Sequence, residues 1–252
     1  MPNLSPHKKI IELVDENYTL AKVLHSFGIK FYKHSEQTLE TICKSCSLGL
    51  DQLAKRLDEL ENNREIYLDE NLQVASITVI LQYLRHAHHV FVRYKLPYMN
   101  ELIANVQPKY FTNRTLAKDL KFIFPHFVED FVKHIYEEED TLFSHIMKLQ
   151  QAVKGDLGLY DLYKITQKYS IEAFAEHHME EDDEMDGIRA LTNNYHMDEH
   201  TTVYTKVIYC ELIAFEKDLA FHSRVENHIL FPKALELEKE VNHQLNIRAG
   251  LN

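Results

Sequence analysis

Apolar residues recur at helical spacing along most of the chain. From Ser76 onward the spacing predicts four long helices, at about residues 77–106, 115–153, 159–192 and 201–242. Pro97 and Pro125 fall inside the first two, and we expect a kink or local break there, because proline lacks the amide N–H that an inner helical turn uses. Four long helices with short connections predict an antiparallel bundle.

The first 60 or so residues have a different pattern. Apolar positions form short helical groups between residues 10 and 60, Phe27-Gly28-Ile29 interrupts them, and the polar residues 61–65 indicate a linker. We therefore expect an all-α protein. A small helical domain at residues 1–65 would precede an up-down four-helix bundle at residues 72–252.

Composition narrows the function classes. The 252 residues are 45% hydrophobic, which suffices for a sizeable core, and only 6 Gly and 6 Pro favour long helices. The net charge of −11 argues against nucleic acid or an anionic membrane as a partner. The chain shows neither an apolar run of roughly 18 residues nor a signal peptide, and three cysteines do not suggest a disulfide framework. The expected compartment is the reducing cytoplasm.

Histidine is unusually frequent, at 16 residues. Five histidines precede an acidic residue by four positions, which places both on one helical face: His126/Asp130, His134/Glu138, His177/Glu181, His178/Asp182 and His222/Glu226. In two of these pairs a Leu-Phe follows the glutamate by four residues, giving a repeated His-x-x-x-Glu-x-x-x-Leu-Phe module. In the first long helix the helical spacing includes a histidine among apolar residues: Ile80, Leu81, Leu84, His88, Phe91 and Tyr94.

Spacing between helices selects a candidate metal site. Each of the four helices carries one histidine that is separated from the next by 45, 44 and 44 residues. All four could therefore lie at the same level of the bundle: His89, His134, His178 and His222. Glu138 and Glu226 would join them. Six ligands exceed the four of a structural zinc but suit two iron or manganese ions with open positions for a small ligand. The neighbouring histidines are assigned to supporting or surface positions, since one of each adjacent pair faces the core: His86, His88, His177 and His228.

Alternative interpretations have less support. A ferritin-type centre needs Glu-x-x-His on two helices, and the sequence has that spacing only at Glu240/His243. The zinc-protease motif His-Glu-x-x-His is absent. Any one pair could also be a solvated pair on a helix surface. The combined pattern favours a hemerythrin-like site.

The chain resembles the di-iron iron–sulfur cluster repair proteins. In the bundle the resemblance lies in HHVFVRYKLPYM, FVKHIYEEEDTLF, EHHMEEDDEMDGIRALTNNY and HSRVENHILFPKAL, and near the N-terminus in VLHSFGIKFYKHSEQTLETIC. It implies a hemerythrin-like bundle, a non-haem di-iron centre and protection or repair of iron–sulfur clusters after nitric oxide or oxidative stress. It implies the same six ligands that spacing selects.

The resemblance is incomplete in the N-terminal segment. The family typically has Cys-Cys-Gly-Gly where this chain has Tyr32, Lys33, His34 and Ser35. Steps that need a thiol pair there are therefore in doubt. Cys43 and Cys46 could replace that pair or could be small apolar residues of a helix.

Three functions follow as hypotheses. The first is a repair-like protein whose di-iron centre binds or reduces nitric oxide or dioxygen, or donates iron, with damaged iron–sulfur proteins as partners. The second is a sensor that binds dioxygen, nitric oxide or iron without turnover. The third is a structural bundle with satisfied core histidines. Whether the protein is an enzyme stays open, and the N-terminal segment could pair two chains into a homodimer.

Overall fold

The computed structural model describes residues 4–62, 68–111, 114–168, 170–180 and 184–250. These residues form helices and connecting turns, with one isolated antiparallel bridge between Lys9 and Thr38. The expected all-α fold is confirmed. The chain divides into two compact units. The first unit consists of residues 1–66, 99–122 and 189–214, and the second consists of residues 67–98, 123–188 and 215–252.

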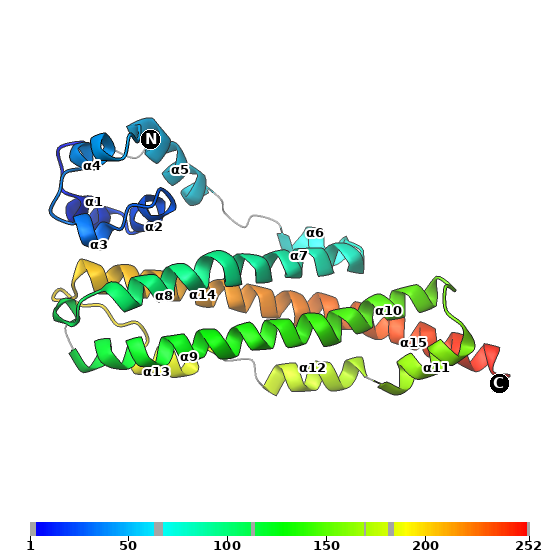
Figure 1. Ribbon diagram of the computed structural model, residues 1–252. Coiled ribbons are helices and arrows are strands. Elements are labelled where there is room, and N and C mark those ends of the chain that lie inside the picture. Colours follow the sequence, from blue (N-terminus) through cyan, green and yellow to red (C-terminus); the bar gives the residue numbers. More distant parts are fainter. Residues whose placement is uncertain (1–3, 63–67, 112–113, 169, 181–183, 251–252) are drawn as a thin grey trace. The chain divides into compact units, whose positions relative to one another are not determined.

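The first unit contains the short N-terminal helices. These are α1 (Ile10–Glu16), α2 (Thr19–Ser26), α3 (Phe31–His34), α4 (Leu39–Ser45) and α5 (Leu50–Asn62) (Figure 1). Leucines four residues apart on α2 and α5 are fully buried and form the centre of this unit: Leu20, Leu24, Leu53 and Leu57. The predicted break after α2 is confirmed, because Gly28 has φ +77° and the N–H of Ile29 returns to the carbonyl of Leu24 at 3.0 Å.

The first unit also contains parts of longer helices. They are the end of α8 (Leu96–Asn105), the 3-10 turn η2 (Pro108–Tyr110), the start of α9 (Arg114–Glu138), the end of α13 (Asp186–Leu191) and the start of α14 (Val203–Val225). This grouping differs from the division at residues 65–72 that the sequence suggested. The division into a 1–65 domain and a 72–252 domain stays a prediction.

Glu101 on α8 anchors the N-terminal helices of this unit. Its carboxylate accepts hydrogen bonds from Lys30, from His25 Nε2 at 3.1 Å and from the Tyr32 hydroxyl at 3.1 Å. The bond from Lys30, followed by that from His25, lowers the pKa of Glu101 to about 2. Tyr32 is thus held in a polar cluster with Lys30 and His25 around the Glu101 carboxylate.

We expect Glu101→Gln to lower the free energy of unfolding at pH 7 by about 1–2 kcal/mol, allowing for solvent screening of this part-exposed group. The folded pKa lies below the value of roughly 4.3 in an unfolded chain. The ionised group therefore stabilises the fold above that value, and the stabilisation declines as pH falls toward the folded pKa. Urea unfolding at pH 7 and pH 3 measures this, with Glu236→Gln on an exposed helical surface as control. An effect of Glu101→Gln that is equal at both pH values would contradict the account.

The second unit is an up-down helical bundle. One run comprises α7 (Ile77–Val90), the π-helical turn η1 (Phe91–Lys95) and the start of α8, preceded by the short α6 (Leu68–Val74). Another comprises most of α9, the π turn η3 (Glu139–Phe143) and α10 (Ser144–Val153). A third comprises α11 (Leu159–Lys168) and α12 (Ile171–Glu180). The last comprises the end of α14, the π turn η4 (Glu226–Leu230) and α15 (Phe231–Arg248). Successive runs alternate in direction (Figure 1).

The core of the second unit forms from apolar stripes on these runs. Its most deeply buried members include Ile80, Leu84, Phe143, Leu149 and Leu230. On each run the members of this core recur at three- and four-residue intervals, as in Phe143, Ile146 and Leu149, so each helix buries one face and exposes the other. Within the described residues no helix combines the length and apolar character that crossing a bilayer requires.

Two of the predicted helices have the expected extent, but each contains a π turn. Pro125 lies inside α9, and Pro97 is the second residue of α8, directly after η1. A π turn adds one residue to the helical repeat and rotates the next helical segment about its axis. Tyr94, which the apolar spacing predicted to be buried, is therefore 65% exposed.

The prediction of one continuous helix over residues 159–192 is wrong. Three helices, α11, α12 and α13, cover this range. Ser170 lies outside any helix, and its hydroxyl accepts a hydrogen bond from the N–H of Ala173 at 3.5 Å. Ser170 therefore caps the N-terminus of α12, which begins as a separate helix. Residues 169 and 181–183 lie outside the described part of the chain, as does most of the expected linker at 61–65.

Candidate metal centre

Three buried side chains of the second unit and one partly buried side chain, that of His222, converge. They are His88 on α7, Glu138 at the end of α9, His222 on α14 and Glu226 at the start of η4. One nitrogen or carboxylate oxygen from each lies within 4.8 Å of all the others. Imidazole and carboxylate are the ligand types of non-haem iron and manganese sites. This group could therefore hold a metal ion.

Glu226 faces imidazoles on two sides. Its side chain is 0% exposed, its Oε1 lies 3.1 Å from Nε2 of His222, and its Oε2 lies 3.0 Å from Nε2 of His178 on α12. Within the described part of the chain, neither oxygen accepts a well-aligned hydrogen bond. Each oxygen of one carboxylate is thus paired with a different histidine, which is the arrangement that a carboxylate bridging two ions needs.

His88 is oriented by a carboxylate behind it. Its Nδ1 lies 2.8 Å from Oε1 of Glu139, while its Nε2 faces Nε2 of His222 at 3.1 Å and Oε2 of Glu138 at 3.4 Å. Burial, followed by the charge of His222, lowers the pKa of His88 to about 3. The ring is therefore neutral at pH 7. With Nδ1–H donated to Glu139, the Nε2 lone pair points into the group, as in metal-binding histidines held by an outer carboxylate.

The two buried glutamates have opposite pKa shifts. Burial, and then the charge of Glu226, raises the pKa of Glu138 well above its usual value. Burial also acts to raise the pKa of Glu226, but the imidazoles of His222 and His178 lower it well below the usual value. Oε1 of Glu138 is buried, and none of the described residues donates a hydrogen bond to it. Two carboxyl groups this close share a proton or need a cation, so the donor set fits a metal centre.

The two remaining predicted residues lie beside this group. His178 contacts Glu226, which belongs to the group. The centroids of the His134 and His178 rings lie 6.3 Å apart. His134 Nε2 also faces Oε1 of Glu184 at 3.9 Å. The structure therefore brings together most of the predicted set: His134, Glu138, His178, His222 and Glu226. That they bind metal stays a proposal.

The prediction of His89 needs correction. His89 is exposed, and its ring contacts Tyr94 at the surface, whereas His88 is 2% exposed and occupies the place expected for His89. The reason is helical phase. Leu81, Leu84 and His88 share the buried face of α7, and one further residue rotates a side chain by about 100° to the outside.

A π turn adjoins the group on each of three runs. Glu138 immediately precedes η3, Glu226 is the first residue of η4, and η1 begins three residues after His88. The two copies of the His-x-x-x-Glu-x-x-x-Leu-Phe module thus have the same local structure, an α-helix that becomes a π turn at the glutamate. Single π turns inside α-helices are frequent at functional sites.

Aromatic rings surround the histidines. The ring of Phe143 stacks on His88 with centroids 5.5 Å apart, Phe231 contacts His178 at 5.5 Å, and Phe91 contacts His222 at 5.7 Å. Phe131 and Phe215 pack against Phe91 on the far side. This apolar shell limits access of bulk water and strengthens electrostatic interactions within the group.

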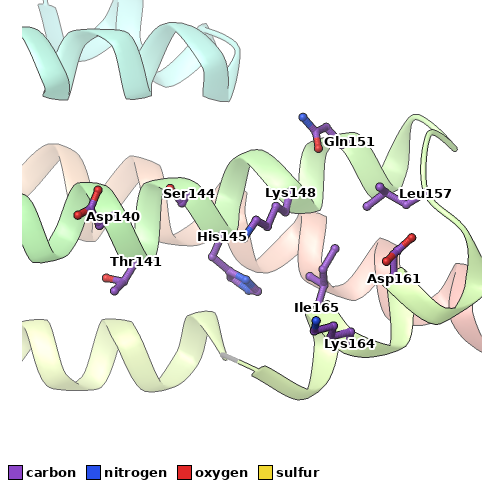
Figure 2. A pocket seen from close by; sticks show the side chains of 10 residues that line it. All are labelled: Asp140, Thr141, Ser144, His145, Lys148, Gln151, Leu157, Asp161, Lys164 and Ile165. Atoms are coloured by element: carbon purple, nitrogen blue, oxygen red, sulfur yellow. The ribbon is translucent and has the colours of Figure 1, made fainter.

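A separate pocket of about 370 Å³ opens between α10 and α11 (Figure 2). Its lining includes charges of both signs, among them Asp140, Lys148, Asp161 and Lys164, and the largely buried His145. None of the four converging side chains lines it. The pocket is therefore distinct from the candidate metal centre.

Removing the carboxylate behind His88 should weaken metal binding. We expect Glu139→Ala to reduce the affinity for Co²⁺ by about 10–100-fold, because the Nδ1–H of His88 loses its acceptor and the ring its fixed orientation. Titration followed by the visible absorption of Co²⁺ measures this. Glu139→Gln keeps an acceptor oxygen and should lose less. Equal affinities of the alanine variant and the unaltered protein would show that Glu139 does not orient the histidine.

Comparison with known proteins gives consistent relatives. No family model matches the chain. It is 19% identical over 224 residues to the iron–sulfur cluster repair protein ScdA of Staphylococcus haemolyticus, covering 89% of this chain and 96% of the relative. It is 23% identical over 218 residues to the repair proteins YtfE of Yersinia pestis and Yersinia pseudotuberculosis, covering 86% of this chain and 91% of each relative. Over nearly its whole length the chain is thus a distant relative of the iron–sulfur cluster repair proteins, which confirms the resemblance seen in its sequence.

Proposed function

We propose that this protein holds two iron ions in a hemerythrin-like di-iron centre and takes part in repairing iron–sulfur clusters damaged by nitric oxide or oxidative stress. The observation that carries the proposal is the position of Glu226, whose two oxygens face histidines of two different helices. The relatives named as iron–sulfur cluster repair proteins supply the cellular role. Manganese is the alternative metal for the same ligands.

The side chains divide between two metal positions. His88 and His222 would serve the first and His134 and His178 the second, with Glu138 and Glu226 between them. Bound iron would supply an open coordination position for nitric oxide or dioxygen and one-electron chemistry. The chain's own contribution is to orient the His88 imidazole through Glu139 and to exclude water with Phe91, Phe143 and Phe231.

A sensor without turnover is the second candidate, and the N-terminal segment favours it. The Tyr32 hydroxyl is held by Glu101 at the place where a thiol pair is expected, so that segment offers no thiolate for redox exchange. Cys43 and Cys46 are poor replacements for such a thiol pair. Burial raises the pKa of the Cys43 thiol. Both cysteines lie at the C-terminal end of α4, whereas a helix N-terminus is the end that favours a thiolate. The three cysteines are free, which supports the cytoplasm as the compartment. A homodimer stays a prediction.

An activity assay tests the repair role. A [4Fe–4S] hydro-lyase inactivated by nitric oxide is incubated with the iron-loaded protein and a reductant, and recovered hydro-lyase activity is measured. We expect recovery with the unaltered protein and none with Glu226→Ala. No recovery with either would contradict repair.

The gas chemistry separates the two candidates. Nitrous oxide formed from nitric oxide by the reduced protein would indicate catalysis. A spectral change that reverses when nitric oxide is removed, with no nitrous oxide, would indicate sensing.

A further inference from the structure

The two metal positions differ in their surroundings. At the first, the side chains of His88 and His222 are 2% and 11% exposed. At the second, His178 and His134 are 13% and 33% exposed, so the difference lies at His134. An ion at the second position would therefore be closer to solvent and would have room for an additional ligand.

Glu184 is placed to be that ligand. It follows α12, and the next residue, Met185, is buried and fixes the segment at the bundle. Oε1 of Glu184 lies 3.9 Å from Nε2 of His134. That distance is too long for a hydrogen bond. Two neighbouring ligand atoms that bind one ion at about 2.1 Å each lie roughly 3.0–3.4 Å apart, so a small approach of Glu184 to His134 would allow both to bind one ion.

The Glu184 side chain is only partly buried. It is 27% exposed and faces His134, which is itself 33% exposed.

We propose that Glu184 is a terminal ligand of the second metal position, which makes the two ions of the centre unequal. This inference rests on the proposed di-metal function. The first ion would have two imidazoles and the bridging carboxylates. The second would have two imidazoles, the same bridges and one further carboxylate. An extra anionic oxygen favours the harder, more oxidised ion, and it leaves the first position with more room for a small ligand.

The simpler role of Glu184 is an ion pair with His134 and no contact with metal. The two roles differ in what can replace the side chain. A histidine can bind the ion but cannot pair with the ring of His134 as a carboxylate does. Glu184→His should therefore restore metal affinity only if Glu184 is a ligand.

Iron affinity and Mössbauer spectra of the ⁵⁷Fe-loaded protein test the inference. We expect two doublets of equal area from the unaltered protein. In Glu184→Gln one doublet should change, and the second iron should bind at least about tenfold more weakly, while Glu184→His recovers most of the affinity. Glu137→Gln is the matched control, since it removes one charge beside Glu138 from an exposed position.

Two outcomes would overturn the inference. One is a Glu184→Gln protein that matches Glu137→Gln in affinity and spectrum. The other is a loss of affinity that Glu184→His leaves unrepaired. In both cases the proposed function is still supported if the unaltered protein contains two irons. An unaltered protein that contains no iron would contradict the proposed function itself. Far-ultraviolet circular dichroism confirms that each variant is folded.

Discussion

Glu226→Ala is expected to reduce bound iron from about two ions per chain to near zero, because it removes a donor from both metal positions at once. Oε1 of Glu226 faces His222 and Oε2 faces His178, so no other single side chain of the group faces both sides at such short distances. Glu138 would then be the only carboxylate of the group left between the two positions. Iron per chain, measured after loading and gel filtration, gives the result directly.

The controls for this variant separate ligand loss from misfolding. Glu137→Gln should retain two irons, since its side chain is exposed on α9. His134→Ala should lose about one iron, because it serves only the second position. If Glu226→Ala kept its full iron content while folded, the carboxylate would not bridge the ions, and the geometry of the centre would need another explanation.

Removal of the metal should destabilise the protein strongly. The buried carboxyl groups of Glu138 and Glu226 repel each other when both are ionised, and bound cations would cancel that repulsion. A free metal concentration about 1,000 times the dissociation constant stabilises the folded state by about 4 kcal/mol for each site. The midpoint of urea unfolding should therefore fall clearly when a chelator strips the metal.

A double variant identifies the source of that stability. Glu138→Gln/Glu226→Gln should unfold at the same urea concentration with and without metal. An unaltered protein whose unfolding midpoint does not respond to metal would instead favour the structural bundle with satisfied core histidines.

The sequence predicted the glutamates of the centre better than its first histidine. Helical spacing and the repeated Leu-Phe module selected Glu138 and Glu226, and both are buried in the converging group, because both copies of the module occur on amphipathic helices. Equal intervals between histidines selected His89. The apolar stripe of the same helix contains His88, and this stripe was the better guide, since burial depends on helical phase and not on chain distance.

Other features had no periodic signal in the sequence. The π turns change the helical repeat by one residue, so Tyr94 falls on the exposed surface although its spacing predicted burial. Glu184 lies after α12 in a segment that was predicted to be continuous helix. Glu139 was one of several adjacent acidic residues, and only its contact with His88 distinguishes it. Such pairings depend on tertiary packing, which a single sequence does not reveal.

Metal content tests the central claim most directly. Protein produced with ample iron and purified without chelator should contain about two transition-metal ions per chain, mainly iron, as two positions with shared carboxylates require. A folded and stable protein with no bound metal would contradict the di-metal centre and leave the convergence of His88, Glu138, His222 and Glu226 as a structural feature of the bundle core.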